Sequence, residues 1–457
     1  MRPNSPPLPA KAPPLWQQLQ ATAAVLLAVT TQGRSATAAL EAVAPTLRPG
    51  VQAQVFHVLR GLGRARALRA HLARRKPAPE PDALLCCALA LLGGEPAPYE
   101  GFTLVDQAVE AAKRERKSSA QASFLNACLR RYLRERHALD AAIDHDPVAR
   151  WNHPPWWIEQ LRREYPDDWQ HILAANNTHP PLTLRVNETK TEFRQYGQAL
   201  HAINIEANPV VDTGWSLATA VPVQRLPGFA EGWFSVQDAA AQRAAPLLLA
   251  QWPGAGAPTA PPLRLLDACA APGGKTAHLL EYAATRLQRS VQVTALEIDP
   301  IRARRITENL QRLGLTAEVR VADAADVPSW FSGQPFDAIL LDAPCTASGI
   351  VRRHPDVRWL RQPGDIVRLA EIQATLLRRL WPLVAPGGRL LYCTCSVFRA
   401  EGVIQQQTFL AHNTDAELMP SPGHLLPGRA FADGSVLDNS RTDEDGFFYA
   451  LFRKRGA

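Results

Sequence analysis

Hydrophobic and polar residues alternate along this chain with two different periods. From about residue 16 to about residue 139, apolar residues recur every three or four positions, as in amphipathic helices, and strand-like runs are almost absent. The clearest stretch is 52–72, where arginines separate leucines and valines, and 104–112 and 122–133 follow the same pattern. Residues 15–145 are therefore predicted to form an all-α domain with basic faces.

Beyond residue 234 the pattern changes to short apolar runs that alternate with helical stretches. Such alternation is typical of a parallel sheet covered by helices on both faces. A final run at 447–452 is predicted to add a last strand, in either direction. The other strands are predicted at 263–267, 291–297, 319–322, 336–342 and 389–392, and the main helices at 301–313 and 366–383.

Two further segments complete the predicted organisation. Residues 1–14 contain six prolines and few large apolar side chains, which indicates a disordered leader. Residues 146–233 mix aromatic residues and prolines with short apolar runs, of which 182–187 alternates like a strand. We expect a small α+β connecting subdomain there, followed by the α/β domain over 234–457.

Composition and charge add a candidate partner. The chain has 457 residues, of which 46% are hydrophobic, so we expect an ordinary globular protein with more than one domain. Residues 1–150 contain 20 Lys and Arg against 12 Asp and Glu, whereas the rest contains 30 against 31. This uneven net charge suggests that the first part binds a polyanion such as nucleic acid. The alternative is a basic surface that only keeps the protein in solution.

Cysteine content and hydropathy exclude several classes. The seven cysteines are odd in number and form no Cys-x-x-Cys pair, which indicates neither a disulfide framework nor a zinc site. We therefore expect no metal and a cytoplasmic location. The apolar run 21–29 is too short to span a bilayer, so no membrane segment is expected. A monomer is the default expectation.

A loop with two glycines follows the first strand of the predicted α/β domain. Such glycines let the backbone approach a ligand, and the helix that follows offers free amides. The loop matches neither a P-loop nor a GxGxxG motif, so no pyrophosphate is specifically indicated. Lys275 opposes the dipole of that helix, which suggests that it faces a negative or reactive group. The loop comprises Cys269, Ala270, Ala271, Pro272, Gly273, Gly274 and Lys275.

Acidic residues stand at the ends of the next two strands. Glu297 ends the second strand, where Rossmann-like proteins bind the ribose hydroxyls of a nucleoside. Asp323 follows the third strand and is a candidate acceptor for an adenine amino group. Asp299 is predicted instead to cap a helix that begins at Pro300.

Two cysteines follow strands that are predicted to belong to one parallel sheet. Cys345 comes after 336–342, and Cys395 comes after 389–392. The carboxyl ends of parallel strands lie on one edge of a sheet, so the two thiols are predicted to meet there. A single free cysteine is usually an inert, buried residue, but the pairing favours a functional role.

These motifs resemble those of the RsmB/NOP-type RNA cytosine-5 methyltransferases. The resemblance rests on 267–276, on Asp342 to Cys345 and on Thr394 to Ser396, and it is strong over 226–457 and weaker over the first 140 residues. It implies an α/β fold with a Rossmann-like class I methyltransferase domain, preceded by a NusB-like RNA-binding domain. Segments 226–229, 236–238, 352–356 and 445–449 resemble the bacterial members that act on 16S ribosomal RNA.

The resemblance also implies a cofactor and roles for the site residues. S-adenosylmethionine would bind at 269–275, Glu297, Asp323 and Asp342. Carbon 5 of cytosine is a poor nucleophile, so a thiolate first adds to carbon 6, and a base later removes the proton on carbon 5. By resemblance, Cys395 attacks and Cys345 assists release.

Two more residues are expected to support this chemistry. Asp342 is expected to hydrogen-bond or protonate ring nitrogen 3 of the cytosine, its alternative role being to cap the turn before Pro344. The positive charge of Lys275 is expected to favour a neighbouring thiolate.

A basic segment between the two cysteines is a candidate RNA contact. Arg352, Arg353, His354 and Arg358 surround Trp359, a mixture that suits contact with the RNA backbone and stacking on a base. The alternative is an ordinary helix that buries Trp359.

Other functions stay open on the sequence alone. The catalytic motifs do not distinguish an enzyme that methylates ribosomal RNA from one that methylates transfer RNA. The long helical domain favours ribosomal RNA. A non-catalytic RNA-binding or antitermination factor is a second alternative, disfavoured by the complete set of motifs. DNA cytosine methylation is less favoured, because DNA enzymes typically carry their nucleophile in a Pro-Cys motif, where this chain has Cys345.

Overall fold

The computed structural model describes residues 13–93, 97–219, 221–253, 255–256, 261–427 and 443–456. Residues 1–12 of the predicted leader lie outside the described residues. The chain divides into two compact units, one of Met1–Arg163 with His354–Arg361 and one of Glu164–Arg353 with Gln362–Ala457. Within the described ranges, no helix combines the length and apolar character needed to cross a membrane.

The first unit is helical throughout its described residues, as the hydrophobic period predicts. Helix α4 is buried along almost its whole length, from Pro81 to Leu92, and packs with the apolar faces of its neighbours. A helix that is apolar all round belongs at the centre of a core. The helices are α1 (Leu15–Gln32), α2 (Ala36–Glu41), α3 (Arg48–Leu72), α4 (Pro79–Gly93), α5 (Gly101–Arg114), η1 (Ser119–Gln121), α6 (Ala122–Ile143), α7 (Pro147–Trp151), α15 (Val357–Leu360) and all but the last residue of α8 (Pro155–Glu164).

This unit extends beyond the boundary predicted at residue 145. Asn152 accepts a hydrogen bond from the Gly63 amide at 2.6 Å and donates one to the Leu59 carbonyl at 3.0 Å, so the chain after α6 is fixed to α3. Helix α15, distant in sequence, is held in the same way. The indole of Trp359 donates to the Leu59 carbonyl at 3.0 Å, and Asp356 accepts from the Ala36 amide at 2.8 Å.

The second unit begins with a small antiparallel sheet in the order β2-β3-β1-β4. Its core contains Leu184, Tyr196, Leu200 and Phe234. These elements have the α+β character expected of the connecting segment. They are α9 (Trp169–Ala175), β1 (Leu182–Val186), α10 (Phe193–Ala202), β2 (Ala207–Val210), β3 (Gly214–Leu217), η2 (Val223–Arg225) and β4 (Phe234–Val236).

A seven-stranded sheet in the order β10-β11-β9-β8-β5-β6-β7 forms the rest of the second unit. Strands β5 to β9 run parallel, whereas β11 is antiparallel to β9 and β10 to β11. The Rossmann-like architecture is thereby confirmed. The strands are β5 (Leu263–Asp267), β6 (Val291–Glu297), β7 (Glu318–Val321), β8 (Phe336–Asp342), β9 (Val384–Thr394), β10 (Ala416–Leu425) and β11 (Phe447–Lys454).

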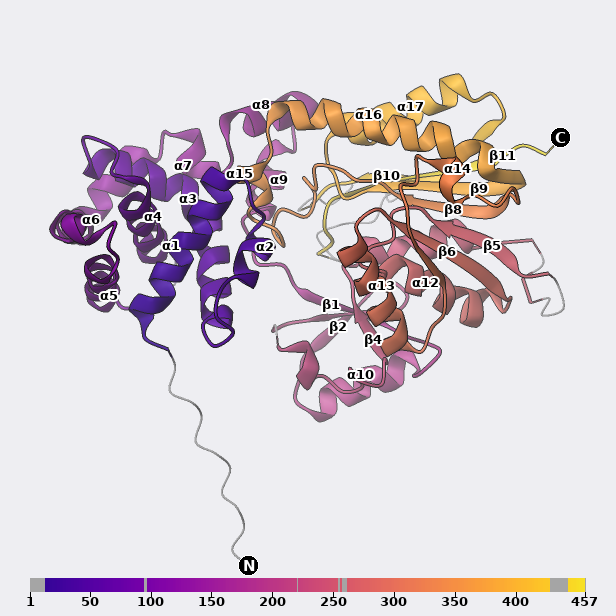
Figure 1. Cartoon of the computed structure of the whole chain (residues 1–457), viewed down its shortest axis with the longest axis horizontal. Coiled ribbons are helices and arrows are strands. Elements are labelled where there is room, and N and C mark those ends of the chain that lie inside the picture. Colours follow the sequence, from indigo (N-terminus) through magenta and orange to yellow (C-terminus); the bar gives the residue numbers. More distant parts are fainter. Residues whose placement is uncertain are drawn as a thin grey trace, which may run out of the picture. The chain divides into compact units, whose positions relative to one another are not determined.

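Helices cover both faces of this sheet. Figure 1 shows α16 and α17 on one face and α12 and α13 on the other. The strand order reverses between β5 and β8, and ligands of open α/β sheets bind at the carboxyl ends of the strands at such a point. The helices are η3 (Ala241–Arg243), α11 (Ala244–Leu249), α12 (Gly274–Tyr282), η4 (Ala283–Leu287), α13 (Pro300–Leu313), α14 (Val327–Trp330), α16 (Pro363–Leu380), η5 (Trp381–Leu383), η6 (Arg399–Glu401) and α17 (Val403–His412).

Candidate active site

Two thiols meet at the carboxyl edge of β8 and β9. The parallel register places Asp342 beside Cys393, and the loops that follow bring Cys345 Sγ within 3.4 Å of Cys395 Sγ. The Gly349 amide donates to the Cys395 carbonyl at 2.9 Å and holds the two loops together. Cys345 is buried and Cys395 is half-buried. The two cysteines predicted to share this edge therefore do so.

The neighbouring Cys393 has different surroundings. Its side chain is fully buried, and its Sγ donates to Asp342 Oδ1 at 3.5 Å. Burial raises the pKa of the Cys393 thiol well above its usual value. The two cysteines of the Cys-Thr-Cys segment therefore have different neighbours: Cys393 is buried and faces Asp342, whereas Cys395 faces Cys345.

Lys275 and Asp342 form an ion pair beside these thiols. Lys275 lies in the first turn of α12, and its Nζ is 2.6 Å from Asp342 Oδ2. Burial by itself would lower the pKa of Lys275, but the charge of Asp342 and the neighbouring Cys393 and Cys395 together raise it. The ammonium of Lys275 therefore stays charged. Its position at the start of a helix predicted a negative group nearby, and that group is Asp342.

The glycine loop is tied to the sheet on both sides. The Ala268 amide donates to the Leu340 carbonyl and the Ala270 amide to the Leu296 carbonyl, each at 2.9 Å. Gly273 has a φ of 92°, and a Cβ there would lie 3.1 Å from the backbone Cα of Ile306. Both the conformation and the space require glycine at this position.

A buried carboxyl group lies beneath this loop. Asp267, the last residue of β5, is fully buried, and its Oδ2 accepts a hydrogen bond from Thr276 Oγ1 at 2.7 Å. Burial raises the pKa of Asp267 to about 7. This carboxyl group was not among the predicted site residues, although it ends the strand that carries the loop.

The other predicted acids stand along the same sheet edge. Glu297 ends β6, where its Oε1 accepts from the Asp299 amide at 3.1 Å, and Asp323 is exposed just after β7. Asp299 caps α13, as predicted, by accepting from the amides of Ile301 and Arg302. With Asp267 at the end of β5, acidic side chains stand at the carboxyl ends of the three adjacent strands β5, β6 and β7. Across the described ranges, no group of three or more His, Cys, Asp or Glu residues is arranged to hold a metal ion.

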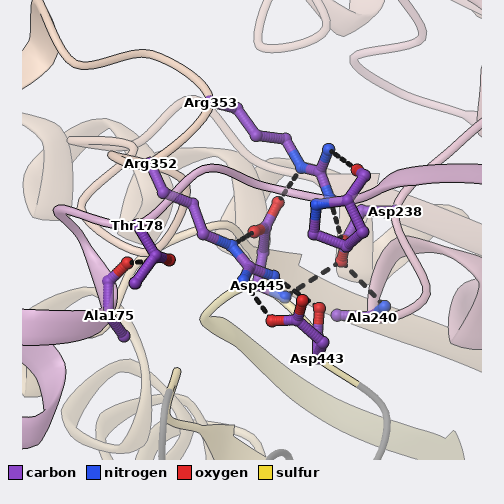
Figure 2. Close-up of polar contacts among 9 residues, drawn as sticks. Ala175, Thr178, Asp238, Ala240, Arg352, Arg353, Asp443 and Asp445 are labelled. Atoms are coloured by element: carbon purple, nitrogen blue, oxygen red, sulfur yellow. Dashed lines mark hydrogen bonds and ion pairs between the residues drawn. The ribbon is translucent and has the colours of Figure 1, made fainter. Parts of the chain in front are cut away.

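The structure places Arg352 and Arg353, two of the predicted RNA contacts, in ion pairs within the protein. Arg352 is only 2% exposed, and its guanidinium binds the carboxylates of Asp443 and Asp445. Arg353 binds Asp445 as well, and its Nη2 lies 2.6 Å from Asp238 Oδ2. Figure 2 shows both guanidinium groups turned toward these acids. Their charges are neutralised within the protein, which argues against the predicted contact with phosphate.

Arg358, a third predicted RNA contact, is also held within the protein. It lies on α15 in the first unit, is fully buried, and donates to the Asn152 carbonyl at 3.2 Å. Burial lowers the pKa of Arg358 to about 9. Trp359 packs against the helical core, which was the alternative considered for it. Of the four residues, His354 is exposed, and RNA contact there stays a prediction.

The strand order, the glycine loop after β5 and the acids along the edge define a Rossmann-like methyltransferase. Residues 259–453 match the family model described as 16S rRNA methyltransferase RsmB/F, and 153–224 match a model for the ferredoxin-like domain of RsmF/B-like methyltransferases. Ribosomal RNA small subunit methyltransferase B of Vibrio cholerae is 42% identical over 77% of this chain and 76% of the relative. The protein of the same name from Vibrio vulnificus is 38% identical over 95% and 99%. The chain therefore belongs to the RsmB/F family of 16S rRNA methyltransferases.

Solved structures show the same fold. The crystal structure of PH0851 has a TM-score of 0.73 and 24% sequence identity, covering 95% of this chain and 99% of the other. NSun6 from Pyrococcus horikoshii, solved with SFG, has a TM-score of 0.54 and 18% identity over 66% and 99%.

Proposed function

We propose that this protein transfers a methyl group from S-adenosylmethionine to carbon 5 of a cytosine in 16S ribosomal RNA, through a covalent adduct with Cys395. The observation that carries the proposal is the 3.4 Å approach of the Cys345 and Cys395 sulfurs at the edge of a methyltransferase sheet. A reaction that adds a nucleophile to carbon 6 and later expels it uses two groups in sequence. Family membership supports the ribosomal substrate.

The residues along the edge suit S-adenosylmethionine. Gly273 has a positive φ and leaves little space for a side chain, and Glu297 and Asp323 offer carboxylates at the ends of adjacent strands. Carboxylate oxygens accept hydrogen bonds from ribose hydroxyls and from an adenine amino group. When bound, the cofactor supplies an electrophilic methyl group.

The attack on the base is assigned to Cys395. Its half-buried sulfur is more accessible than those of Cys345 and Cys393, which are buried. As the thiolate adds to carbon 6, electron density shifts through carbon 4 to ring nitrogen 3, which takes a proton that the Lys275 ammonium, 2.6 Å from Asp342, passes through the Asp342 carboxyl group. Ring nitrogen 3 gives this proton back along the same path when the product forms.

Release is assigned to Cys345. Its hydrogen bond to Cys395, followed by burial, raises the pKa of the Cys345 thiol well above its usual value. Cys345 can pass its own proton to the departing Cys395 sulfur, 3.4 Å away, as it takes the proton from carbon 5, and a sulfur with so high a pKa is a strong base for that step. Loss of the carbon 5 proton restores the carbon 5–carbon 6 double bond as the bond between carbon 6 and Cys395 breaks.

Recognition of the RNA is assigned to the helical first unit, which we propose to be NusB-like. Its residues supply the excess of basic side chains in the chain. The target base must leave its stack to reach Cys395, so a loop or an opened helix end is the expected site.

The proposal is tested by mapping the product. Purified full-length protein is incubated with S-adenosylmethionine and either small-subunit RNA or transfer RNA from a strain that lacks the gene, and modified bases are located by mass spectrometry and bisulfite sequencing. We expect a 5-methylcytosine in 16S ribosomal RNA. A mark found solely in transfer RNA, or a methyl group on another atom, would overturn the proposal.

A further inference from the structure

One buried carboxylate contacts both loops that carry the thiols. Glu401 ends the short helix η6 and is fully buried. Its Oε1 accepts from the Thr346 amide at 2.9 Å and from Gln373 Nε2 at 3.1 Å. Its Oε2 accepts from Ser396 Oγ at 2.6 Å and from the Thr346 hydroxyl. Four donors therefore surround the two oxygens.

Two of the three residues bonded to the carboxylate are the direct neighbours of the two thiols. Thr346 follows Cys345, and Ser396 follows Cys395. Glu401 is itself anchored, because its carbonyl accepts from Tyr392 Oη at 2.7 Å and from Thr394 Oγ1 at 3.2 Å. The carboxylate is thus a bridge between two segments that are otherwise about fifty residues apart in the chain.

Burying the charged carboxylate of Glu401 costs free energy, which the hydrogen bonds around it must offset. Burial raises the pKa of Glu401, and the hydrogen bonds from Ser396 and Thr346 oppose that effect. A buried polar network whose members are all bonded makes the segments that it joins more rigid and favours a single arrangement of them. The segments that this network joins are those that carry the two sulfurs.

We propose that Glu401 is a positioning residue that sets the distance between Cys345 and Cys395. Its consequence for catalysis rests on the function proposed above, but its effect on the two sulfurs does not. Glu401→Ala removes the acceptor that these four donors share, although Gln373 Nε2 keeps its bond to the Pro344 carbonyl at 2.9 Å and Ser396 Oγ keeps its contact with Ser348 Oγ at 2.8 Å. Glu401→Gln keeps one oxygen for the Thr346 amide and Gln373, and its new amide group can donate to the Ser396 and Thr346 hydroxyls.

The first test is kinetic and uses the full chain with 16S ribosomal RNA. We expect Glu401→Ala to lower kcat about 100-fold with KM nearly unchanged, because misplaced reacting groups slow the chemical step. We expect Glu401→Gln to restore kcat to within about threefold of the parent, because the hydrogen-bond geometry survives. Glu371→Ala, an exposed glutamate of α16, is the matched control and should leave kcat unchanged.

The second test measures the sulfur pair without any turnover. Phenylarsine oxide bridges two thiols that lie close together, with loss of water, and the bridged Cys345–Cys395 peptides are quantified by mass spectrometry. The parent and Glu401→Gln should be bridged, whereas Glu401→Ala should lose most of the bridged product. Thermal unfolding separates misfolding from displacement. If Glu401→Ala fails to fold, Thr346→Val and Ser396→Ala each remove one link and should lower bridging in the same direction.

The two tests separate this inference from the proposed function. A parent protein that forms no 5-methylcytosine overturns the function, and the arsenical result still decides the role of Glu401. Folded Glu401→Ala protein that keeps parental bridging and kcat overturns the positioning role. A loss of activity in Glu401→Gln equal to that in Glu401→Ala, with bridging intact in both, would also overturn it, because the negative charge rather than the geometry would then matter.

Discussion

At the scale of single residues, the pH dependence of Asp267 is a direct consequence of burial. Its pKa is raised from 3.8 to about 7, so the folded protein binds this proton more tightly than the unfolded chain does. The contribution of Asp267 to the free energy of unfolding therefore falls as the pH rises through this window and levels off above it. Asp267→Asn has a similar shape and no proton to lose.

Urea unfolding of the parent and of Asp267→Asn, from about pH 4 to about pH 8, measures this difference. We expect the free energy of unfolding of the parent, relative to the variant, to decrease with rising pH up to about pH 7. Parallel curves over the whole range would show that Asp267 titrates normally.

Short sequence motifs are enough to predict some of the candidate site residues. Residues whose position depends on partners far away in the chain are missed. Cys345, Cys395, Asp342 and Lys275 come together because each stands at the end of a recognisable strand or the start of a helix. Glu401 carries no local signal, since its role depends on loops that meet only in the folded chain. For the same reason, the sequence suggests that Arg352 is exposed, because its buried partner Asp445 is 93 positions away in the chain.

At the scale of elements, a buried ion pair joins β1 to α12. Arg185 Nη2 lies 3.0 Å from Glu281 Oε1, and both side chains are almost fully buried. Arg185 Nη1 also donates to the carbonyl of Gly274, the first residue of α12, at 2.9 Å. The small sheet is thereby linked to the helix that follows the glycine loop.

Arg185→Ala leaves the carboxylate of Glu281 buried without this partner, which we expect to lower the free energy of unfolding by about 3–5 kcal/mol. Arg286→Ala is the control, because its pair with Glu188 is half exposed and should contribute at most about 1 kcal/mol. Urea denaturation of both variants provides the measurement. Equal, small losses would contradict a structural role for the buried pair.

Elements with a clear period are predicted well and irregular ones are not. The bounds of β5, β6 and β8 match the sequence prediction because buried parallel strands are continuous apolar runs. Strand β10 was not predicted. It contains Pro420 and Pro422, and prolines are tolerated in a strand at the edge of a sheet. The membership of α15 in the helical unit rests on contacts with α3 that no local pattern reveals.

At the scale of the whole molecule, uneven charge is the feature that bears on RNA binding. Arg130 and Arg134 are exposed one turn apart on α6. If they contact phosphates, replacing both by alanine should weaken binding to any RNA sequence and reduce the slope of log affinity against log salt by up to about 2.

The control for that prediction is Arg378→Ala with Arg379→Ala, which removes two exposed charges from α16 in the second unit. Filter binding over a range of salt concentrations gives the slope for each double variant. Identical slopes for both would mean that the basic face of the first unit is merely solvated.

The most direct test of the central claim is a gel assay for covalent protein–RNA adducts with two single variants, run beside a turnover assay. Cys395→Ala should form no adduct and no 5-methylcytosine, because the attacking sulfur is gone. Cys345→Ala should accumulate an adduct that withstands denaturation, because attack proceeds and release does not. An adduct in Cys395→Ala and none in Cys345→Ala would contradict the assignment of the two thiols.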